Sequence, residues 1–407
     1  MKKTPNRYLI LAAAAISGLM VGIALTWSIF KNPLMEKNQW TSNTVTLTYS
    51  LYMLFACFGT LLCPVLQKKI KPHLLVLTGG VMHGMGLYFT GYANAVWQMY
   101  LSYSVMAGLS NGFIYNTAIS AATKWFPDKK GFANGICVGC MGLASLIFAP
   151  LGNYLIANFD VGAAFRILGL LMTGIFLVIS WFIAIPEEGW KPAGMADTET
   201  TAAASSHDLH WKALLKTPAF YTMWLMTLCA VTAGSMMTGQ ASAIAQHMAG
   251  ITAAQASTLV AIMAVANFSG RLAFGSISDK FGRYQVLFVL LCVSGLDMLF
   301  LFPQADSYLL FMVALCTAAA CYGGTMAMLP SLVSDAFGAR YFSTNYACIY
   351  TGFTCASFVG PMAASNVLQN TGSYQRAFLI AGVLALAGIV LSILTRKNLA
   401  RSRTHTA

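Results

Sequence analysis

Stretches of apolar residues long enough to cross a bilayer as an α-helix, about 20 residues each, recur along this chain of 407 residues. We count twelve, near 8–30, 45–66, 74–92, 97–120, 133–158, 163–184, 218–246, 254–277, 285–303, 307–332, 344–369 and 374–395. Only 9% of the residues are charged, whereas a soluble domain has about 25%. The chain is therefore predicted to be an all-α membrane protein with twelve transmembrane helices.

The basic residues predict which ends of these helices face the cytoplasm. The first apolar stretch follows Lys2, Lys3 and Arg7, but it is too long for a signal peptide and lacks a convincing cleavage site, so we expect it to remain as the first helix. With both termini cytoplasmic, 19 of the 24 Lys and Arg residues fall on cytoplasmic segments. This distribution is typical of membrane proteins. The net charge of +12 therefore reflects topology in a lipid bilayer and does not indicate nucleic acid as a partner.

The ten cysteines all lie within the predicted spans, where they are interpreted as small apolar residues. Cys137 and Cys140 form a CxxC motif, but no histidine or second CxxC motif accompanies it. No metal site and no cofactor are expected.

A polar segment at residues 185–217 divides the twelve spans into six and six. It has the composition of a flexible linker, which predicts an N-terminal bundle over 1–184 and a C-terminal bundle over 218–407. A constant offset of 211 residues relates the two halves, because it aligns Phe126 with Phe337, Pro150 with Pro361, Gly59 with Gly270, and Gly112 with Gly323. Such a parallel duplication predicts a substrate site at the midplane between two six-helix bundles.

Arg271 stands in the middle of an otherwise apolar window, 254–277. A charge at the bilayer centre costs about 2.5–3.5 kcal/mol on insertion scales, so such residues usually have a function. A planar guanidinium suits bidentate recognition of a carboxylate, and Asn267 lies one turn earlier on the same helix face. The alternatives are that Arg271 snorkels to the interface or pairs permanently with Asp297.

Two other polar residues within spans are interpreted as structural. Asp297 is the only acid well inside a span and is a formal candidate for a proton site, but we expect it near the external end of a peripheral helix, in reach of water. His83 is expected to have a packing or hydrogen-bonded role.

The segment "GSISDKFGR" resembles the loop signature of major facilitator transporters, which would comprise Gly275, Asp279, Lys280, Gly282 and Arg283. We expect Asp279 to meet the N-terminal dipole of a neighbouring helix while Lys280 and Arg283 lie at the cytoplasmic face. The corresponding loop of the first half, "VLQKKIKPH", has Lys68 in place of the acid. Gating through the N-terminal half is therefore expected to differ.

The chain also resembles the oxalate/formate exchangers and the related bacterial monocarboxylate transporters. The stretches that carry this resemblance include "TWSIFKNP", "KWFPDKKGFANG", "LLKTPAFYTMW", "ANFSGRLAFGSISDKFGR", "GGTMAMLPSLVSDAFG" and "NYACIYTGF". The resemblance implies that Arg271 faces the central cavity and pairs with a substrate carboxylate. It also implies that aromatic side chains surround a small anion, at the positions of Trp27, Tyr115, Tyr322 and Tyr350, with Asn111 as a weaker member.

Departures from the family pattern narrow the expected substrate. Oxalate-exchanging relatives carry a lysine at the position of Phe353, and an aromatic residue at the position of Met326. One fixed cation favours a substrate with one negative charge, because a second carboxylate would be desolvated without a partner. Met326 and Leu25 are expected to add an apolar wall. Asn267 stands where the more distant animal monocarboxylate symporters have an aspartate, which leaves the coupling open.

The predicted function is secondary transport of a small monocarboxylate, in the class of lactate, pyruvate or formate, across a bacterial plasma (inner) membrane. Alternating access of two bundles would be coupled to protons or to a counter-anion, and a monomer is expected. The alternatives are an oxalate-like dicarboxylate exchanger and a non-transporting carboxylate sensor. Drug efflux is disfavoured because the acids that commonly handle cations are absent. An enzyme is not expected, since no nucleophile with a base and no metal cluster is found.

Overall fold

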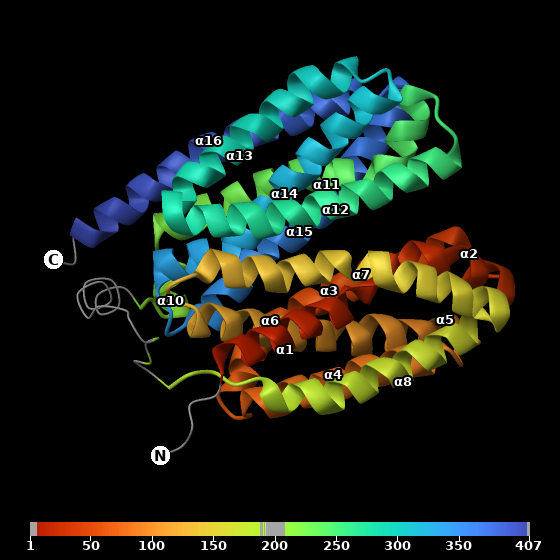
Figure 1. The fold of residues 1–407 in the computed structure, drawn as a ribbon, viewed down its shortest axis with the longest axis horizontal. Helices are drawn as coiled ribbons and strands as arrows, with labels where there is room; N and C mark the ends of the chain where they lie inside the picture. The colour runs from red at the N-terminus through yellow and green to blue at the C-terminus, as the bar shows by residue number, and fades with distance from the viewer. Residues whose placement is uncertain (1–5, 188–189, 191, 193–207, 405–407) are drawn as a thin grey trace. The chain divides into compact units, whose positions relative to one another are not determined.

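The computed structural model describes residues 6–187, 190, 192 and 208–404, and most of the predicted linker lies outside this part of the chain. The described residues form helices and connecting turns, without a strand (Figure 1). Among them, ten helices are long and apolar enough to cross a membrane. The predicted class, a helical protein with many membrane-spanning helices, is confirmed.

The twelve-span count is not confirmed, since two of the predicted spans are not among these ten. The window 74–92 corresponds to α4 (Pro72–Thr90). The window 97–120 is covered by α5 (Val96–Met99), the π-helical η2 (Tyr100–Ala107) and α6 (Gly108–Trp125). Both windows are helical, so their assignment as spans rests on the sequence.

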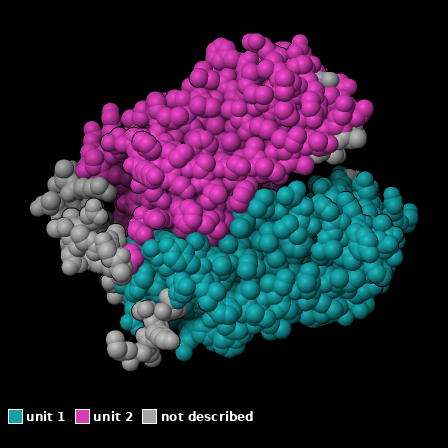
Figure 2. All heavy atoms as spheres, in the orientation of Figure 1, with its two compact units in different colours: residues 1–127, 140–191 teal, residues 128–139, 192–407 magenta. Residues whose placement is uncertain are grey.

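The chain divides into two compact units, coloured separately in Figure 2. Unit 1 comprises Met1–Pro127 and Cys140–Lys191, and unit 2 comprises Asp128–Gly139 and Pro192–Ala407. Helix α7 (Lys130–Asn158) therefore begins in unit 2 and continues in unit 1. The sequence placed the whole of 1–184 in one bundle; in the structure, residues 128–139 pack with the helices of unit 2.

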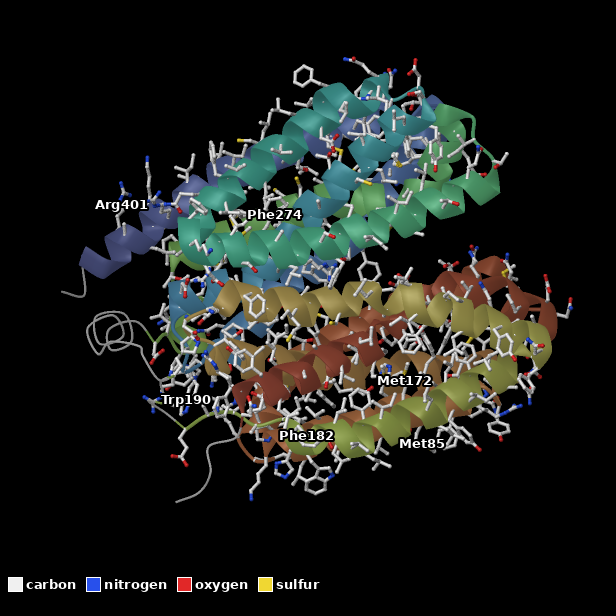
Figure 3. The ribbon with its side chains drawn as sticks, in the orientation of Figure 1. Met85, Met172, Phe182, Trp190, Phe274 and Arg401 are labelled. Carbon is white, nitrogen blue, oxygen red and sulfur yellow. The ribbon has the colours of Figure 1, made fainter. Side chains whose placement is uncertain are left out.

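Unit 1 is built from helix pairs that are distant in the sequence. Its further elements are α1 (Arg7–Val21), η1 (Gly22–Thr26), α2 (Trp27–Asn38), α3 (Ser42–Gln67), α8 (Val161–Ile179) and η3 (Ser180–Phe182). Helix α3 packs against α6, and α4 packs against α8. Met172 on α8, labelled in Figure 3, is completely buried in this packing.

Unit 2 has a corresponding organisation around an apolar core. Its elements are α10 (Trp211–Leu214), α11 (Pro218–Ala249), α12 (Ala253–Phe281), α13 (Arg283–Leu296), the π-helical η4 (Asp297–Leu301), η5 (Phe302–Gln304), α14 (Tyr308–Phe337), α15 (Phe342–Thr371) and α16 (Gln375–Thr404). Helix α12 packs against α14, and α11 packs against α15 and α16. Phe302, Phe311 and Phe378 are fully buried, and the ring of Phe302 contacts the rings of the other two.

Polar side chains determine where several helices begin. Asn6, Thr41, Asp160, Thr217 and Ser307 each stand directly before a helix and accept a hydrogen bond from a backbone N–H of its first turn. The first N–H groups of a helix have no partner within the helix, so such residues stabilise its start.

The internal repeat predicted from the sequence is visible as the same close packing in both units. A Cβ atom at Gly59 on α3 would clash with the backbone carbonyl of Leu109 on α6. A Cβ atom at Gly270 on α12 would clash with the carbonyl of Ala320 on α14. Both members of the second pair lie 211 positions after those of the first. The two glycines therefore serve the same helix crossing.

The other aligned glycines behave in the same way. At Gly112 on α6, an added Cβ would meet the carbonyl of Ala56, and at Gly323 on α14 it would meet the carbonyl of Asn267. These partners are also 211 residues apart. Two helix pairs thus repeat their contacts residue by residue, which indicates that the halves arose by duplication.

Candidate functional site

Arg271 lies ten residues before the C-terminal end of α12, about 15 Å along the helix axis. Its side chain is only 9% exposed. A guanidinium nitrogen, Nη1, donates a hydrogen bond to the backbone carbonyl of Val138 on α7, within unit 2. This hydrogen bond ties the buried guanidinium of α12 to the first part of α7.

The close crossing of α12 and α14 positions this side chain. The Cγ atom of Arg271 would lie 3.1 Å from a Cβ atom at Gly323, so the arginine stem runs across the surface that this glycine leaves open. Asn267, one turn earlier, is 8% exposed and donates from Nδ2 to the carbonyl of Ala319 on α14 at 2.9 Å. Its amide group therefore holds the two helices together next to Arg271.

The other predicted residues of unit 2 lie on α14 and α15. Tyr322 presses its ring against Gly234 of α11, where an added Cβ would overlap the ring. Met326 is buried. Tyr350 and Phe353 stack on each other with ring centroids 4.8 Å apart. Tyr322 and Met326 thus lie on α14, and Tyr350 and Phe353 lie on α15.

The four predicted residues of unit 1 have different surroundings. Trp27 is buried, and its ring lies 4.3 Å from that of Tyr103. Asn111 donates a hydrogen bond to the hydroxyl of Tyr52 at 2.7 Å. Tyr115 is buried, whereas Leu25 is 42% exposed.

Tyr52 and Tyr103, whose rings are 5.1 Å apart, were not predicted from the sequence as neighbours of Asn111 and Trp27. The chain contains 17 tyrosines, and neither of these two lies in a stretch with a family resemblance. The hydrogen bond from Asn111 is the feature that singles out Tyr52, and it is visible only in the structure.

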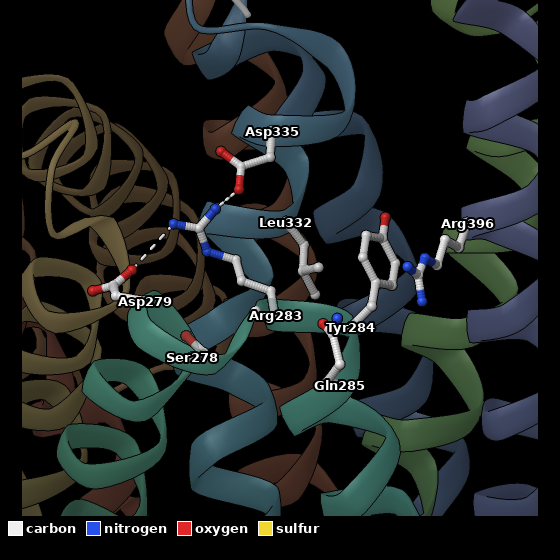
Figure 4. A pocket seen from close by; sticks show the side chains of 9 residues that line it. Ser278, Asp279, Arg283, Tyr284, Gln285, Leu332, Asp335 and Arg396 are labelled. Carbon is white, nitrogen blue, oxygen red and sulfur yellow. Dashed lines mark hydrogen bonds and ion pairs between the residues drawn. The ribbon is translucent and has the colours of Figure 1, made fainter. Parts of the chain in front are cut away.

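A charged network occupies the end of unit 2 where α12 meets α13 (Figure 4). Asp279 accepts hydrogen bonds from the backbone N–H groups of Gly131 at 2.9 Å and Phe132 at 3.0 Å, both in the first turn of α7. Arg283 donates to Asp279 at 3.1 Å and forms a second ion pair with Asp335 of α14. A carboxylate at a helix N-terminus is favoured by the unsatisfied N–H groups and by the helix dipole.

Lys130 extends this network, since its ammonium group lies 2.8 Å from a carboxylate oxygen of Asp335 and 3.1 Å from the hydroxyl of Ser334. We call Lys130, Asp279, Arg283, Ser334 and Asp335 the loop network. Lys130, Ser334 and Asp335 were not predicted from the sequence to take part in this network. The sequence feature that could have pointed to these three residues is their position near Phe126 and Phe337, which the internal repeat aligns.

Gly282 shapes the turn on which the network depends. Its φ of +89° lies in a region that side chains with a Cβ rarely adopt. The turn brings Arg283, the first residue of α13, back to Asp279 near the end of α12. Gly275 lies where an added Cβ would be 2.5 Å from the carbonyl of Gly131. Lys280 is exposed and lies outside the loop network.

A cavity of about 320 Å³ lies beside the loop network. Its lining includes Asp279, Arg283, Tyr284, Gln285, Asp335 and Arg396 (Figure 4). None of the residues predicted to bind substrate lines it. Two acids and two arginines give it mixed charge, and we assign it no ligand.

The expectation for Asp297 was wrong. Its side chain is 4% exposed and therefore does not reach water. Neither carboxyl oxygen has a hydrogen-bond partner among the described residues, so the alternative of a permanent pair between Arg271 and Asp297 is also excluded in this conformation. The sequence placed Asp297 near a helix end, but packing of α14 and α16 against η4 covers it.

His83 has the hydrogen-bonded packing role expected for it. Its side chain is fully buried, and Nδ1 lies 3.1 Å from the carbonyl of Ala107 and 3.2 Å from the hydroxyl of Ser110. These contacts join α4 to the end of η2 and the start of α6.

Comparison with protein families gives a match over nearly the whole chain. The model of the Major Facilitator Superfamily matches residues 10–248 and 223–406. Two solved structures share the fold at low sequence identity. The fucose transporter FucP in its outward conformation gives a TM-score of 0.73 at 14% identity, covering 96% of this chain and 99% of that chain. The proton:xylose symporter XylE gives a TM-score of 0.76 at 13% identity, covering 96% of this chain and 95% of that chain.

Curated relatives are similar at 25–28% identity. The uncharacterized MFS-type transporter YhjX of Escherichia coli (strain K12) is 28% identical over 352 residues, 86% of each chain. The oxalate:formate antiporter of Oxalobacter formigenes is 27% identical over 390 residues, 95% of this chain and 91% of the relative. Monocarboxylate transporter 12 of Homo sapiens is 25% identical over 360 residues, which are 82% of this chain and 70% of the relative.

Proposed function

The chain belongs to the Major Facilitator Superfamily, a family of membrane transporters and not of enzymes, and from this premise we propose that it transports a small monocarboxylate. The proposed substrates are of the lactate, pyruvate or formate class. Transport proceeds by alternating access of two bundles and is coupled to protons or to exchange of a second anion. We propose that the protein lies in the bacterial plasma membrane, since two of its relatives are bacterial transporters, and that it acts as a monomer.

The observation that carries this proposal is the environment of Arg271. The guanidinium is buried within α12, its stem is seated against Gly323, and its Nη1 is held by a backbone carbonyl of α7. The planar guanidinium matches a carboxylate in shape and charge, so a substrate carboxylate could accept its hydrogen bonds and pair with its charge. Arg271 is therefore proposed to anchor the carboxylate.

The single charge of the proposed substrate follows from Phe353. The lysine of oxalate-exchanging relatives is replaced here by an aromatic ring that stacks on Tyr350. A second carboxylate beside these two rings would lose its hydration without gaining a cation. A monoanion with a short apolar tail avoids that cost, and buried Met326 adds to the apolar surface.

The loop network is proposed to control one step of the transport cycle. Asp279 holds the first turn of α7 through two backbone N–H groups, and Lys130 holds the same turn through Asp335. Breaking these bonds would release the first turn of α7 from α12 and α14. We propose that the network breaks and re-forms in each cycle.

Uptake of labelled lactate, pyruvate, formate and oxalate into proteoliposomes tests the proposal. Arg271→Ala should reduce monocarboxylate uptake by at least about a hundredfold, since loss of a buried charged partner costs about 3–5 kcal/mol. Arg271→Lys keeps the charge but loses the planar fork, so it should be severely impaired. Arg166→Lys, on a different helix, is the matched control and should transport normally.

Three outcomes would contradict the proposed function or the proposed role of Arg271. Normal uptake by a folded Arg271→Ala protein would remove the arginine as anchor. Oxalate uptake in preference to monocarboxylates would favour the dicarboxylate exchanger. Saturable binding of a monocarboxylate without any flux would favour a carboxylate sensor.

A further inference from the structure

Asp297 is a buried acid that takes no part in the proposed carboxylate site. It begins the π-helical turn η4, and its side chain is 4% exposed. Both carboxyl oxygens lack a hydrogen-bond partner within the described part of the chain. An ionised carboxylate in such surroundings would cost several kcal/mol without compensation, so the group holds a proton in this conformation.

Among the described residues, the elements packed around Asp297 offer no cationic side chain next to it that could balance an ionised carboxylate in place of the proton. From α14, Cys321 is the titratable side chain that interacts with it electrostatically. The stretch of α16 next to this turn is apolar, because Gly382 lies against Leu299, and Ala385 lies against Gly295. The charged residues of α16 are near its ends, at Arg376, Arg396, Lys397, Arg401 and Arg403. Preceding α13 contributes buried Ser294, and η5 contributes no titratable residue.

The π-helical turn gives Asp297 a way to change its surroundings. A π turn contains one more residue than an α turn, and such turns are frequent at functional sites. Conversion of η4 to α-helix would rotate the residues on one side of it by about 100°, the angle between successive residues of an α-helix. Such a rotation can move a side chain from a helix interface to another face of the helix.

We propose that Asp297 is a proton-binding site that couples proton movement to transport. In the described conformation the carboxyl group is neutral. A rearrangement of η4 exposes it, the proton leaves to water on one side of the membrane, and the carboxylate remains hydrated until it takes up a proton from the other side. This proposal rests on the proposed transport function and decides between its two forms of coupling in favour of protons.

Infrared spectroscopy of the purified protein tests the protonation directly. The wild type at neutral pH should show a carboxylic acid C=O band that disappears in Asp297→Asn and remains in Asp306→Asn, a matched control at an exposed acid. If the wild type lacks this band, or if the band survives in Asp297→Asn, Asp297 is not a proton site. This measurement does not depend on any transport activity.

Proteoliposomes then test the coupling. If one proton enters with each monoanion, an inward gradient of one pH unit supports up to about tenfold accumulation of substrate. Asp297→Asn should lose this accumulation while retaining exchange of labelled for unlabelled substrate within about twofold. Accumulation by Asp297→Asn equal to that of the wild type overturns the proposal, as does a wild type that exchanges substrate but never accumulates it. A wild type that neither accumulates nor exchanges any monocarboxylate overturns the proposed function instead, and the infrared band still decides the proton site.

Discussion

Removing the charge of Asp279 should loosen the first turns of α7. The carboxylate accepts two backbone N–H groups of that helix and the guanidinium of Arg283, and the two side chains are only 11% and 14% exposed. In Asp279→Asn, one oxygen remains as an acceptor, but one helix N–H group and the ion pair lose their partner. Hydrogen bonds to a charged group contribute about 1.5–3 kcal/mol. The opening equilibrium of the segment should therefore rise by about 10- to 150-fold.

Hydrogen–deuterium exchange of the segment 128–139 measures this opening, because exchange of a protected amide requires its hydrogen bond to break. The amides of Gly131 and Phe132 should exchange faster by this factor in Asp279→Asn. Lys280→Gln is the matched control, since Lys280 is the exposed neighbour outside the loop network. Protection equal to the wild type in Asp279→Asn, or equal loss in both variants, would refute the argument that this carboxylate holds the helix.

Three further predictions test the packing, the substrate charge and a helix start. Gly323→Ala should lower the free energy of unfolding by about 1–3 kcal/mol, and with it the melting temperature, because the new methyl group meets the carbonyl of Asn267. Gly174 faces open space, so Gly174→Ala should leave the melting temperature unchanged or raise it. Phe353→Lys should raise the preference for oxalate over lactate by about tenfold in competition assays, and the absence of any shift towards dianions would contradict the charge argument. Asp160→Ala should destabilise the protein by about 1 kcal/mol at neutral pH through loss of an N-cap. The backbone N–H of the helix that it caps and nearby Lys37 lower the pKa of Asp160, so this difference should shrink in melting curves only as the pH falls below about 4.

The duplicated halves differ at the two positions that matter most for the proposed cycle. Arg271 lies 211 residues after Thr60, whose hydroxyl merely donates to the carbonyl of Ala56 in its own helix. Asp279 corresponds in the same way to Lys68, which follows α3 directly. The shared helix crossings are thus a common scaffold, whereas Arg271 and Asp279 have no like residue at the matching positions of the first half.

The sequence by itself determined the helical class, the internal repeat and the family. Apolar length requires membrane-spanning helices because a polar backbone inside lipid must bond to itself, and this requirement acts on each segment independently of the rest. The glycines of the repeat were also readable, since Gly59 and Gly270 lie at equivalent close crossings. Arg271 and Asp279 could be singled out from the sequence for the related reason that a charge in an apolar segment, or a loop signature, is a local feature.

Only the tertiary structure decided which partners these side chains meet. The contacts of Asp279 with α7 and of Arg283 with Asp335 join residues far apart in the chain, and no local pattern specifies them. The prediction for Asp297 failed for the same reason. Its distance from a helix end suggested exposure to water, but burial depends on which helices cover that end, and here α14 and α16 do. Exposure is a property of the packed bundle and is not encoded in a single helix.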